Sequence, residues 1–352
     1  YFSEHKKKVS WKLVLWGMVL QMVLALAIMG IPVWGISGPL RFVFSWANGI
    51  ILSLLSFTQE GSQFVFGDLV KSDKIGFIFA FQVLPTIIFM ASLMAVLYHL
   101  KIMQKVVGAL AWVMQKTMNI SGAESLSTAA NIFVGQTEAP LLIKPYVALM
   151  TRSELFTVMV GGMATVAGGV MAAYVGLLKD RIPDIAGHLL TASVMSAPAA
   201  LVIAKLMIPE ILKPKTLGKI PSADEDVLDR NVIEAAARGA HEGLMLALNV
   251  GAMLIAFIAL IAFVNNCFVQ LGYFIHFQDW GGRMIPHIGS GESVSEVPQL
   301  TFQVVLGWIC SPLAWLMGIP WNESILAGTL LGEKVVFNEF VAYLHMSQVS
   351  AQ

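Results

Sequence analysis

Long apolar runs with almost no charge dominate this sequence. A helix that crosses the hydrocarbon core of a bilayer needs about 20 mostly apolar residues, and we expect about six spans of this kind. They cover residues 13–34, 75–97, 155–178, 189–208, 244–269 and 324–343. Only 12% of the 352 residues are charged, whereas a soluble domain carries roughly 25%. The sequence therefore predicts an all-α polytopic membrane protein.

Composition and motifs exclude several other classes of protein. The 22 Lys and Arg residues balance 22 Asp and Glu residues, so no overall basic field attracts nucleic acid. Cys267 and Cys310 are too few and too far apart for a disulfide framework or a paired-cysteine metal site. The HExxH, GxSxG, GxGxxG and Walker A patterns of common enzymes are absent. We therefore expect neither an enzyme nor a nucleic-acid-binding protein.

Several segments do not fit the spanning pattern. Residues 42–57 are apolar but short, so we expect a helix that lies in or against the membrane. Residues 101–116 alternate lysines with apolar residues, which is typical of an amphipathic helix at the interface. Residues 300–317 are uncharged but contain Pro312. These segments indicate interfacial and discontinuous helices beside the spanning ones.

Two polar stretches are expected to face water. Twelve of the 44 charged residues lie within residues 209–242, and residues 276–299 are rich in glycine. Cytoplasmic loops of membrane proteins carry an excess of lysine and arginine. The lysines of residues 1–10, of residues 101–105 and of the first polar stretch share the cytoplasmic side if residues 121–146 return to the face that they leave. The second polar stretch then lies outside.

Residues 121–146 form the segment on which this topology depends. They carry two short apolar patches separated by the sequence VGQTEAP at 134–140, and no helix of spanning length survives that interruption. A re-entrant hairpin, in which two half-helices meet inside the membrane, explains both the pattern and the side on which the lysines lie. A water-facing loop is the alternative that hydropathy leaves open.

The interrupted segments carry the polar residues that a binding site needs. Carboxylates at membrane depth are costly and indicate function by default, which singles out Glu138 and Glu339. Gln136, Thr137 and Glu138 place an amide, a hydroxyl and a carboxylate in consecutive positions, a set that can donate to and accept from the edge of a heterocyclic base. The alternatives are a hairpin tip packed on its own backbone and interfacial carboxylates paired with lysines.

Asn131 and Thr165 offer uncharged oxygen atoms, which suit a small hard cation. Asn131 lies just before the interruption, and Thr165 lies in the small-residue run 161–169. Alone, they are a weak indication, because threonine in membrane helices often bonds its own backbone. Small residues likewise indicate close helix packing first, and only second the wall of a site or an unwound segment.

Two long motifs resemble the signatures of the concentrative nucleoside transporter family. They are NIFVGQTEAPL at 131–141 and GEKVVFNEFVAY at 332–343, the second in the family form Gly-x-Lys-x-x-x-Asn-Glu-Phe-Val-Ala-aromatic. TASVMSAP at 191–198 and LNVGA at 248–252 are also similar to family segments. The similarity covers nearly the whole chain, and two long motifs in the right order are hard to obtain by chance. The chain resembles a bacterial, sodium-coupled member of this family.

The resemblance implies a nucleoside site built from both motifs. Gln136, Thr137 and Glu138 are expected to contact the nucleobase from the first hairpin. Val170 is expected to line the same pocket, and Glu339 is expected to bind the ribose hydroxyl groups. The substrate implied is a nucleoside such as uridine.

A sodium site is also implied by the resemblance. Its expected ligands are the side chains of Asn131 and Thr165 and the backbone carbonyl groups of Val134 and Val166. The amide at Asn131 and the hydroxyl at Thr165 favour sodium over protons as the coupling ion.

The family further implies a homotrimer whose protomers have a static scaffold and a transport domain that moves like an elevator. Within the transport domain we expect the interfacial helix, the re-entrant hairpin at 121–146 and spans at 155–178 and 189–208. The expected division is scaffold at 1–100, transport domain at 101–208, cytoplasmic polar segment at 209–242, scaffold span at 243–275, periplasmic loop at 276–299 and transport-domain helices at 300–352.

Two departures from the family pattern concern the ends of the chain. Family members usually begin with one more hydrophobic helix, and they continue past the second motif into a second re-entrant hairpin and a last helix. We therefore expect this sequence to be a fragment of a longer chain.

The function that the resemblance implies is symport of nucleosides with sodium across a bacterial inner membrane. A proton-coupled nucleoside symporter and a sodium-coupled transporter of another small polar solute are the alternatives. A channel is disfavoured because the interrupted hairpin and its carboxylates give no continuous charged lining.

Overall fold

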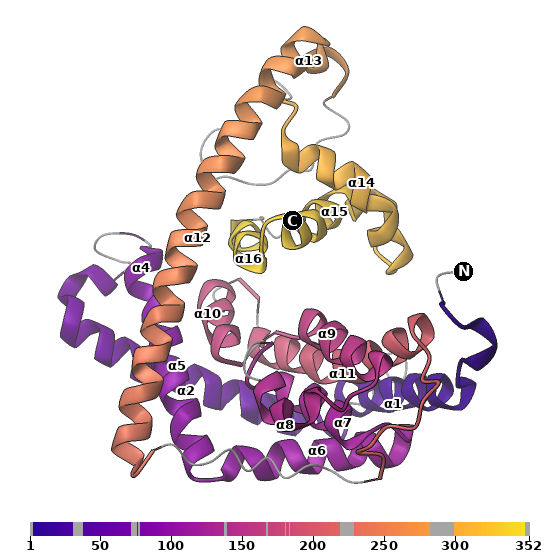
Figure 1. Ribbon diagram of the computed structural model, residues 1–352. Helices are drawn as coiled ribbons and strands as arrows, with labels where there is room; N and C mark the ends of the chain where they lie inside the picture. The colour runs from indigo at the N-terminus through magenta and orange to yellow at the C-terminus, as the bar shows by residue number, and fades with distance from the viewer. Residues whose placement is uncertain are drawn as a thin grey trace. The chain divides into compact units, whose positions relative to one another are not determined.

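The structure is a computed structural model in which the chain divides into two compact units, described separately here. Unit 1 comprises Tyr1–Val175 and Asp184–Leu246, and unit 2 comprises Gly176–Pro183 and Ala247–Gln352. The residues that the structure describes are 3–30, 38–71, 76, 78–136, 139–166, 168–179, 181–182, 184–218, 229–281 and 299–348. Across these residues the fold is helical, as the sequence predicts (Figure 1).

Unit 1 contains most of the chain. Its α-helices are α1 (Trp11–Met29), α2 (Arg41–Phe66), α4 (Phe79–Gln82), α5 (Leu84–His99), α6 (Ile102–Met118), α7 (Gly122–Asn131), α8 (Lys144–Val147), α9 (Arg152–Ala164) and α11 (Ile185–Met207). Its 3-10 helices are η1 (Lys6–Lys8), η3 (Gly67–Val70) and η4 (Ala139–Ile143). The first parts of α10 (Gly168–Leu178) and α12 (Val232–Phe274) also belong to unit 1.

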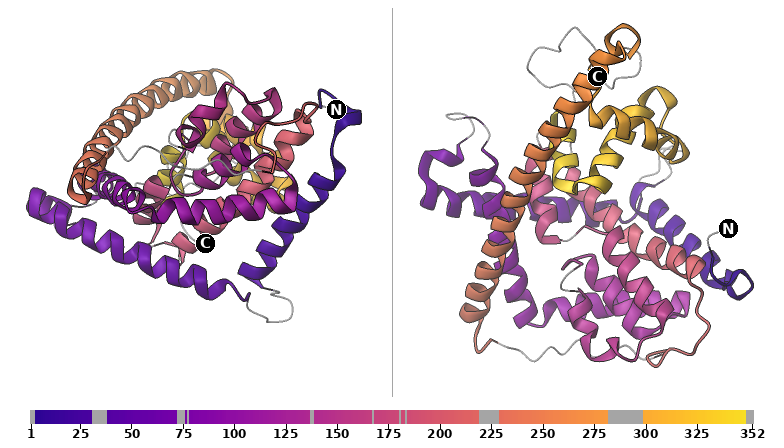
Figure 2. Two further views of the ribbon diagram at one scale, coloured as in Figure 1. Left: turned by 60° about the horizontal axis from the view of Figure 1, so that its bottom comes forward. Right: turned by 45° about the horizontal axis from the view of Figure 1, so that its top comes forward.

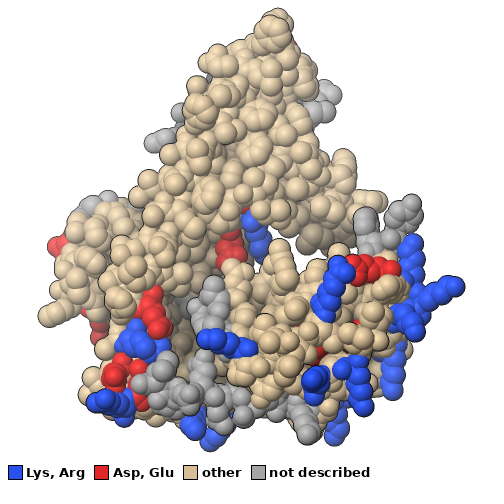
Figure 3. All heavy atoms as spheres, in the orientation of Figure 1, with Lys and Arg blue, Asp and Glu red and all other residues tan. Residues whose placement is uncertain are grey.

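Unit 2 contains the remainder of α12 and the last helices of the chain. These are α13 (Phe277–Trp280), α14 (Phe302–Leu316), α15 (Trp321–Val336) and α16 (Glu339–Gln348). The part of α12 that lies in this unit, from Ala247 onward, contains no Lys, Arg, Asp or Glu. In Figure 3 the surface along this part of the helix is accordingly free of blue and red atoms.

Within the described residues, five helical segments are long and apolar enough to cross a membrane. They are Trp11–Ile28, Arg41–Val70, Phe79–His99, Ile185–Met207 and Val232–Phe274. Four of them match predicted spans. Pro85 lies in the first turn of α5, where the missing amide hydrogen of proline costs no helical hydrogen bond.

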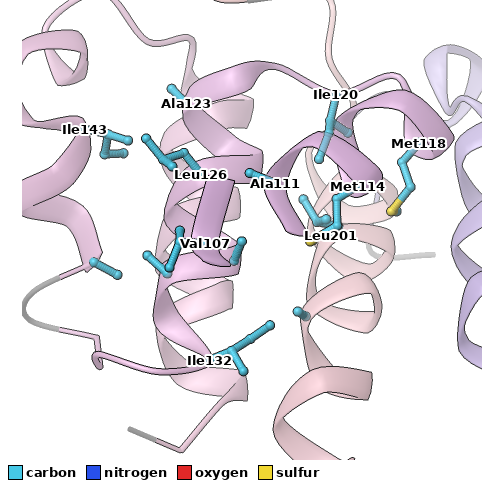
Figure 4. Packing of buried hydrophobic residues seen from close by; sticks show 14 of the residues in the cluster. Val107, Ala111, Met114, Met118, Ile120, Ala123, Leu126, Ile132, Ile143 and Leu201 are labelled. Carbon is cyan, nitrogen blue, oxygen red and sulfur yellow. The ribbon is translucent and has the colours of Figure 1, made fainter. Parts of the chain in front are cut away.

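The core of unit 1 forms where α6, α7, α9 and α11 lie side by side (Figure 2). Met103, Val107, Ala111, Met114 and Met118 recur every three or four residues on α6 and are buried, whereas the lysines of this helix are exposed. Figure 4 shows this stripe against residues of α7 and α11. The structure therefore confirms the amphipathic helix predicted for 101–116, and burial of the stripe fixes α6 against α7.

One close crossing in unit 1 depends on two glycines of α12. A Cβ atom added to Gly239 would lie 2.7 Å from the carbonyl oxygen of Ala91 on α5, and one added to Gly243 would lie 2.8 Å from Ile88 Cα. Ser92 Oγ donates to the carbonyl oxygen of Ala236 at 2.9 Å across the same crossing. Small residues spaced four apart let two helix backbones approach in this way.

The continuous span predicted for 155–178 is wrong. The structure ends α9 at Ala164 and begins α10 at Gly168, with Thr165 in an extended conformation at φ −117° and ψ 160°. The residues at the break are small or apolar, so hydropathy gave no sign of it. The break is fixed by contacts with the residues that follow α7.

The continuous span predicted for 324–343 is also wrong. Helix α15 ends at Val336, Phe337 is not helical, and α16 begins at Glu339. Asn338 Oδ1 accepts a hydrogen bond from the backbone N of Val341 at 3.0 Å, so Asn338 caps the new helix. In contrast, Pro312 does not interrupt α14, and the chain instead bends by 116° between α14 and α15.

Two further boundaries differ from the prediction. The short helix predicted for 42–57 is wrong in length, because α2 continues to Phe66 through polar residues that end the apolar run without breaking the helix. Helix α12 begins at Val232, so the end of the polar segment 209–242 is helical. Residues 219–228 of that segment and 282–298 of the loop 276–299 lie outside the described residues.

Candidate functional site

Helix α7 begins with a capping box. Ser121 Oγ accepts a hydrogen bond from the backbone N of Glu124 at 3.2 Å, and Glu124 Oε2 accepts one from the backbone N of Ser121 at 3.1 Å. This pair satisfies amide groups that a helix N-terminus leaves without helical partners. Every residue from Gly122 to Asn131 is buried, so α7 carries Asn131 at its C-terminal end into the interior of unit 1.

A buried lysine joins three helices at the N-terminal end of α7. Lys205 of α11 forms an ion pair with Glu124 of α7, and its Nζ donates to Ser153 Oγ of α9 at 3.0 Å. The same Nζ lies 3.4 Å from Glu210 Oε2. Lys205 and Glu124 are only 5% and 1% exposed, and charges so deeply buried are tolerated when they are paired and hydrogen-bonded. The cluster therefore holds α7, α9 and α11 in register.

The interruption after α7 lies against the interruption after α9. The backbone N of Gly168 donates to the carbonyl oxygen of Phe133 at 3.0 Å. A Cβ atom at position 168 would lie 2.4 Å from that oxygen, so only glycine permits the approach. The two chain breaks, far apart in sequence, therefore form one junction.

Asn131 and Thr165 meet at this junction. Asn131 Nδ2 donates to the carbonyl oxygen of Gly161 at 2.6 Å and to Thr165 Oγ1. Thr165 Oγ1 in turn lies 3.2 Å from the same carbonyl oxygen and donates to it. Asn131 is 2% exposed, and its Oδ1 has no hydrogen-bond partner among the described residues. The junction thus presents a buried amide oxygen that a ligand can satisfy.

Uncharged oxygen atoms characterise this junction. Val134 and Val166, whose carbonyl groups are the other expected ligands, lie one in each interruption and are half-buried. Among the described residues, no group of three or more His, Cys, Asp and Glu side chains could hold a metal ion. Amide, hydroxyl and carbonyl oxygens suit a hard cation of low charge rather than a transition metal. Asn131 and Thr165 therefore fit an alkali cation.

A small pocket opens between α7 and α9 beside the junction. Thr128 and Asn131 of α7, Gly161 and Gly162 of α9, and Gln136 contribute to its lining. Its empty volume is about 180 Å³, including the space that opens to solvent. A Cβ atom on Gly162 would lie 3.3 Å from Gln136 Cβ, so Gln136 packs directly against α9. Polar groups of α7 and the tip of the interrupted segment thus share one cavity.

The structure places the expected substrate residues as follows. Gln136 is exposed at the mouth of the interruption, and Val170 is half-buried in the first turn of α10. Thr137 and Glu138 lie outside the described residues. Glu339 is the first residue of α16 in unit 2 and is half-buried. Unit 1 therefore brings Gln136 together with the cation candidates, and Glu339 belongs to the other unit.

Unit 2 contains a buried carboxylate beside the second motif. Glu333 is 0% exposed, and its Oε1 lies 2.6 Å from His345 Nδ1. This contact joins α15 to α16 across the break at Phe337 and Asn338. It therefore helps to fix the start of α16, where Glu339 lies.

Sequence reasoning missed Thr128 and Lys205, and it gave Gly161 only as part of the small-residue run 161–169. Thr128 precedes Asn131 by three residues, and this spacing places both on one helix face, so a helical reading of 122–131 could have found it. Lys205 gave no such signal, because its role comes from contacts with α7 and α9 across the fold.

Comparison with family models places the chain among nucleoside transporters. Residues 1–69 match the model described as "Na+ dependent nucleoside transporter N-terminus", residues 80–181 match "Nucleoside recognition", and residues 188–352 match "Na+ dependent nucleoside transporter C-terminus". Together these three models cover both motifs and nearly the whole sequence.

Individual relatives agree. The chain is 42% identical to "Uncharacterized transporter YutK" of Bacillus subtilis, over 97% of this chain and 77% of that protein. It is 40% identical to "Solute carrier family 28 member 3" of Rattus norvegicus, over 99% of this chain and 44% of that protein. The chain is also 41% identical to "Sodium/nucleoside cotransporter 2" of Rattus norvegicus, over 98% of this chain and 47% of that protein. The chain thus spans about half the length of these mammalian relatives.

Solved structures give the same result. The fold is similar to that of CNTnw in an inward-facing substrate-bound state, with a TM-score of 0.83 and 38% identity over 99% of this chain and 78% of that one. A second structure, of a variant of CNTnw in the intermediate 1 state, also has a TM-score of 0.83, with 39% identity over 100% of this chain and 80% of that one. From motifs, fold and relatives together, the chain belongs to the concentrative nucleoside transporter family.

Proposed function

We propose that this protein is a symporter that imports nucleosides together with sodium ions. Support comes from the family models, two of which are described as sodium-dependent, and from relatives named as sodium/nucleoside cotransporters. The absence of common catalytic motifs is consistent with transport rather than catalysis.

The observation that carries the sodium part of the proposal is the buried Oδ1 of Asn131. A buried amide oxygen without a partner is costly, and here it lies at a junction with Thr165. We propose that Asn131 and Thr165, with the carbonyl groups of Val134 and Val166, hold the ion. A bound sodium ion would supply the positive charge that these neutral oxygen atoms lack.

The nucleoside is proposed to bind beside this junction. Gln136, Thr137 and Glu138 follow the first break directly and supply the donors and acceptors that a nucleobase edge requires. Val170 and Glu339 complete the proposed set, with the carboxylate of Glu339 accepting hydrogen bonds from ribose hydroxyl groups. Gln136 packs on Gly162, so the segment that carries the base-binding residues rests on the helix that ends at Thr165.

Cation binding and nucleoside binding are proposed to be coupled because the residues for both lie on the same short stretch of chain after α7. Asn131 ends α7 and also bonds α9 through Gly161, so any tightening of the junction restricts the path of the chain from Asn131 to Gln136. Cation and nucleoside are then expected to strengthen each other's binding by the same factor, because thermodynamic linkage is reciprocal.

The wider architecture is proposed from the family. We propose a homotrimer in a bacterial inner membrane, with residues 1–100 and 243–275 as scaffold and residues 101–208 and 300–352 as a transport domain moving like an elevator. The buried Lys205–Glu124 pair suits such a moving body, because it keeps α7, α9 and α11 together as one rigid group.

Uptake into liposomes tests the substrate assignment. The purified protein is reconstituted, and labelled uridine and adenosine are offered under an inward sodium gradient. We expect Glu339→Gln to lose uptake while Glu323→Gln, a carboxylate at the exposed start of α15, keeps it. Full uptake by Glu339→Gln would contradict the ribose role, and accumulation driven by a proton gradient without sodium would favour the proton-coupled alternative.

A further inference from the structure

Thr128 of α7 is a buried threonine. It is 2% exposed, and its Oγ1 has no hydrogen-bond partner among the described residues. A helical threonine usually donates to a carbonyl oxygen of the preceding turn, as Thr157 does to Ser153 at 2.9 Å. Leaving a buried hydroxyl unsatisfied is costly. Since no protein group in the described part of the chain satisfies this hydroxyl, the exception at Thr128 indicates a bound ligand.

Thr128 Oγ1 and Asn131 Oδ1 line the same pocket. Both are buried side-chain oxygens for which the described residues offer no hydrogen-bond partner, and the two residues are three apart on one face of α7. The amide nitrogen of Asn131 is already engaged by Gly161 and Thr165. The group that Asn131 leaves for the pocket is therefore an acceptor.

Gly161 keeps this pocket open. A Cβ atom at position 161 would lie 3.6 Å from Thr128 Oγ1, in ordinary van der Waals contact. An alanine thus fits without moving the backbone, but its methyl group occupies the space in front of the hydroxyl. This position offers a way to close the pocket without deleting a polar group.

The lining also decides the kind of ligand. Among the described residues, no Lys, Arg or His side chain contributes to the pocket lining, which disfavours an anion. Two acceptor oxygens in a space of about one water molecule suit a small alkali cation or its bound water. A hard cation binds oxygen ligands either directly or through a water molecule that it holds.

We propose that Thr128 is a further ligand residue of the cation site, so that the site extends from Asn131 by one turn along α7. The proposal rests on the sodium coupling proposed above for the identity of the ion. Its structural basis, the two unpartnered oxygens and the glycine facing them, is independent of the nucleoside.

The test is direct cation binding by the purified protein, read as the rise in thermal unfolding temperature with added sodium chloride at constant ionic strength. Ligands that bind only the folded state raise this temperature. Thr128→Val removes the hydroxyl at nearly constant volume, and Thr157→Val is the matched control, since Thr157 is also buried but bonded within its own helix. We expect Thr128→Val to weaken the apparent sodium affinity about 10-fold or more and Thr157→Val to leave it unchanged.

Two further variants test whether weaker sodium binding by Thr128→Val comes from misfolding rather than from loss of the hydroxyl. Thr128→Ser keeps the hydroxyl and is expected to restore most of the sodium response. Gly161→Ala keeps every polar group and replaces a helical glycine by a better helix former, and it too is expected to weaken sodium binding. Equal sodium responses in Thr128→Val and Thr157→Val would overturn the proposal.

The wild-type response separates this inference from the proposed function. A wild-type protein stabilised by sodium, with Thr128→Val unaffected, overturns the extension of the site and leaves sodium coupling intact. A wild-type protein stabilised by uridine but by no alkali cation overturns both.

Discussion

The side-chain amide of Asn131 donates to the carbonyl oxygen of Gly161 over 2.6 Å, joining the end of α7 to the last turn of α9. The two residues are thirty positions apart, and each lies within a few residues of a break in its helix. A single hydrogen bond thus connects the two irregular segments that carry most of the proposed ligands. Substitutions in either segment beside this hydrogen bond are expected to affect ion binding more than other properties of the protein.

Removing Lys205 is expected to be severely destabilising. Lys205→Met leaves Glu124 buried at 1% exposure without its counter-ion, which costs about 3–5 kcal/mol. Thermal unfolding in detergent measures the loss, with Lys213→Met on the exposed loop as the control. The double variant with Glu124→Gln should recover part of the stability. Equal unfolding temperatures for the Lys205 and Lys213 variants would show that the ion pair does not stabilise the fold.

The crossing of α5 and α12 should not accept a larger residue at position 243. Gly243→Val places methyl groups where even a Cβ atom would lie 2.8 Å from Ala91 Cβ and from Ile88 Cα. Overpacking of this kind costs about 1–3 kcal/mol. Gly49→Val on α2, where a Cβ atom would have no neighbour within 4 Å, is the matched control. A similar fall in unfolding temperature for both variants would mean that helix propensity, not the crossing, sets the cost.

Acid is expected to weaken the ion pair between Asp229, which precedes α12, and Arg238 in the second turn of that helix. Arg238 donates to both carboxylate oxygens of Asp229, from Nε to Oδ1 at 2.9 Å and from Nη2 to Oδ2 at 2.8 Å. Chiefly through this hydrogen bonding, the pKa of Asp229 is held below its ordinary value of 3.8. The unfolded chain therefore binds the proton more readily, so the pair stabilises the fold above that value and loses its effect as the pH falls through the lowered pKa.

Asp229→Asn tests this pH dependence. The difference in unfolding temperature between wild type and Asp229→Asn should be constant from pH 7 to pH 5 and should shrink as the pH falls below 3.8. A difference that stays the same down to pH 3 would show that the charge of Asp229 is not what stabilises the fold.

The contact between Glu333 and His345 predicts a local effect on substrate binding. His345→Phe removes the imidazole that lies 2.6 Å from the fully buried Glu333 and so loosens the start of α16. We expect nucleoside affinity to fall, since Glu339 begins that helix, whereas sodium binding in unit 1 should not change. Thermal shifts with uridine and with sodium, measured separately, distinguish the two effects. Loss of the sodium response alone would contradict this account.

Hydropathy predicted the spanning helices well where the chain is continuous. The spans at 13–34, 189–208 and 244–269 correspond to α1, α11 and α12, because an uninterrupted apolar helix depends mainly on its own residues. Hydropathy did not predict the breaks at Thr165 and Phe337, because an average over about 20 residues hides an interruption of two or three. An unwound segment within 161–169 was only the second alternative that its small residues offered. Tertiary contacts set these breaks, such as the approach of Gly168 to Phe133.

The candidate site, too, was predictable from the sequence only in part. The sequence singled out Asn131 and Thr165 as oxygen donors, but only the resemblance to a family suggested that they meet, since nothing local relates residues 34 positions apart. The structure brings the two side chains into contact. It also adds Thr128, Gly161 and the Lys205–Glu124 pair, whose roles depend on which helix faces which.

The most direct test of the central claim, that the junction between Asn131 and Thr165 binds the coupling ion, is sodium-driven uridine accumulation by proteoliposomes containing Asn131→Leu. Wild type and Thr157→Val are predicted to concentrate uridine under an inward sodium gradient, and Asn131→Leu is predicted to show no stimulation by sodium while remaining folded. Stimulation of Asn131→Leu by sodium to the wild-type level would contradict the account.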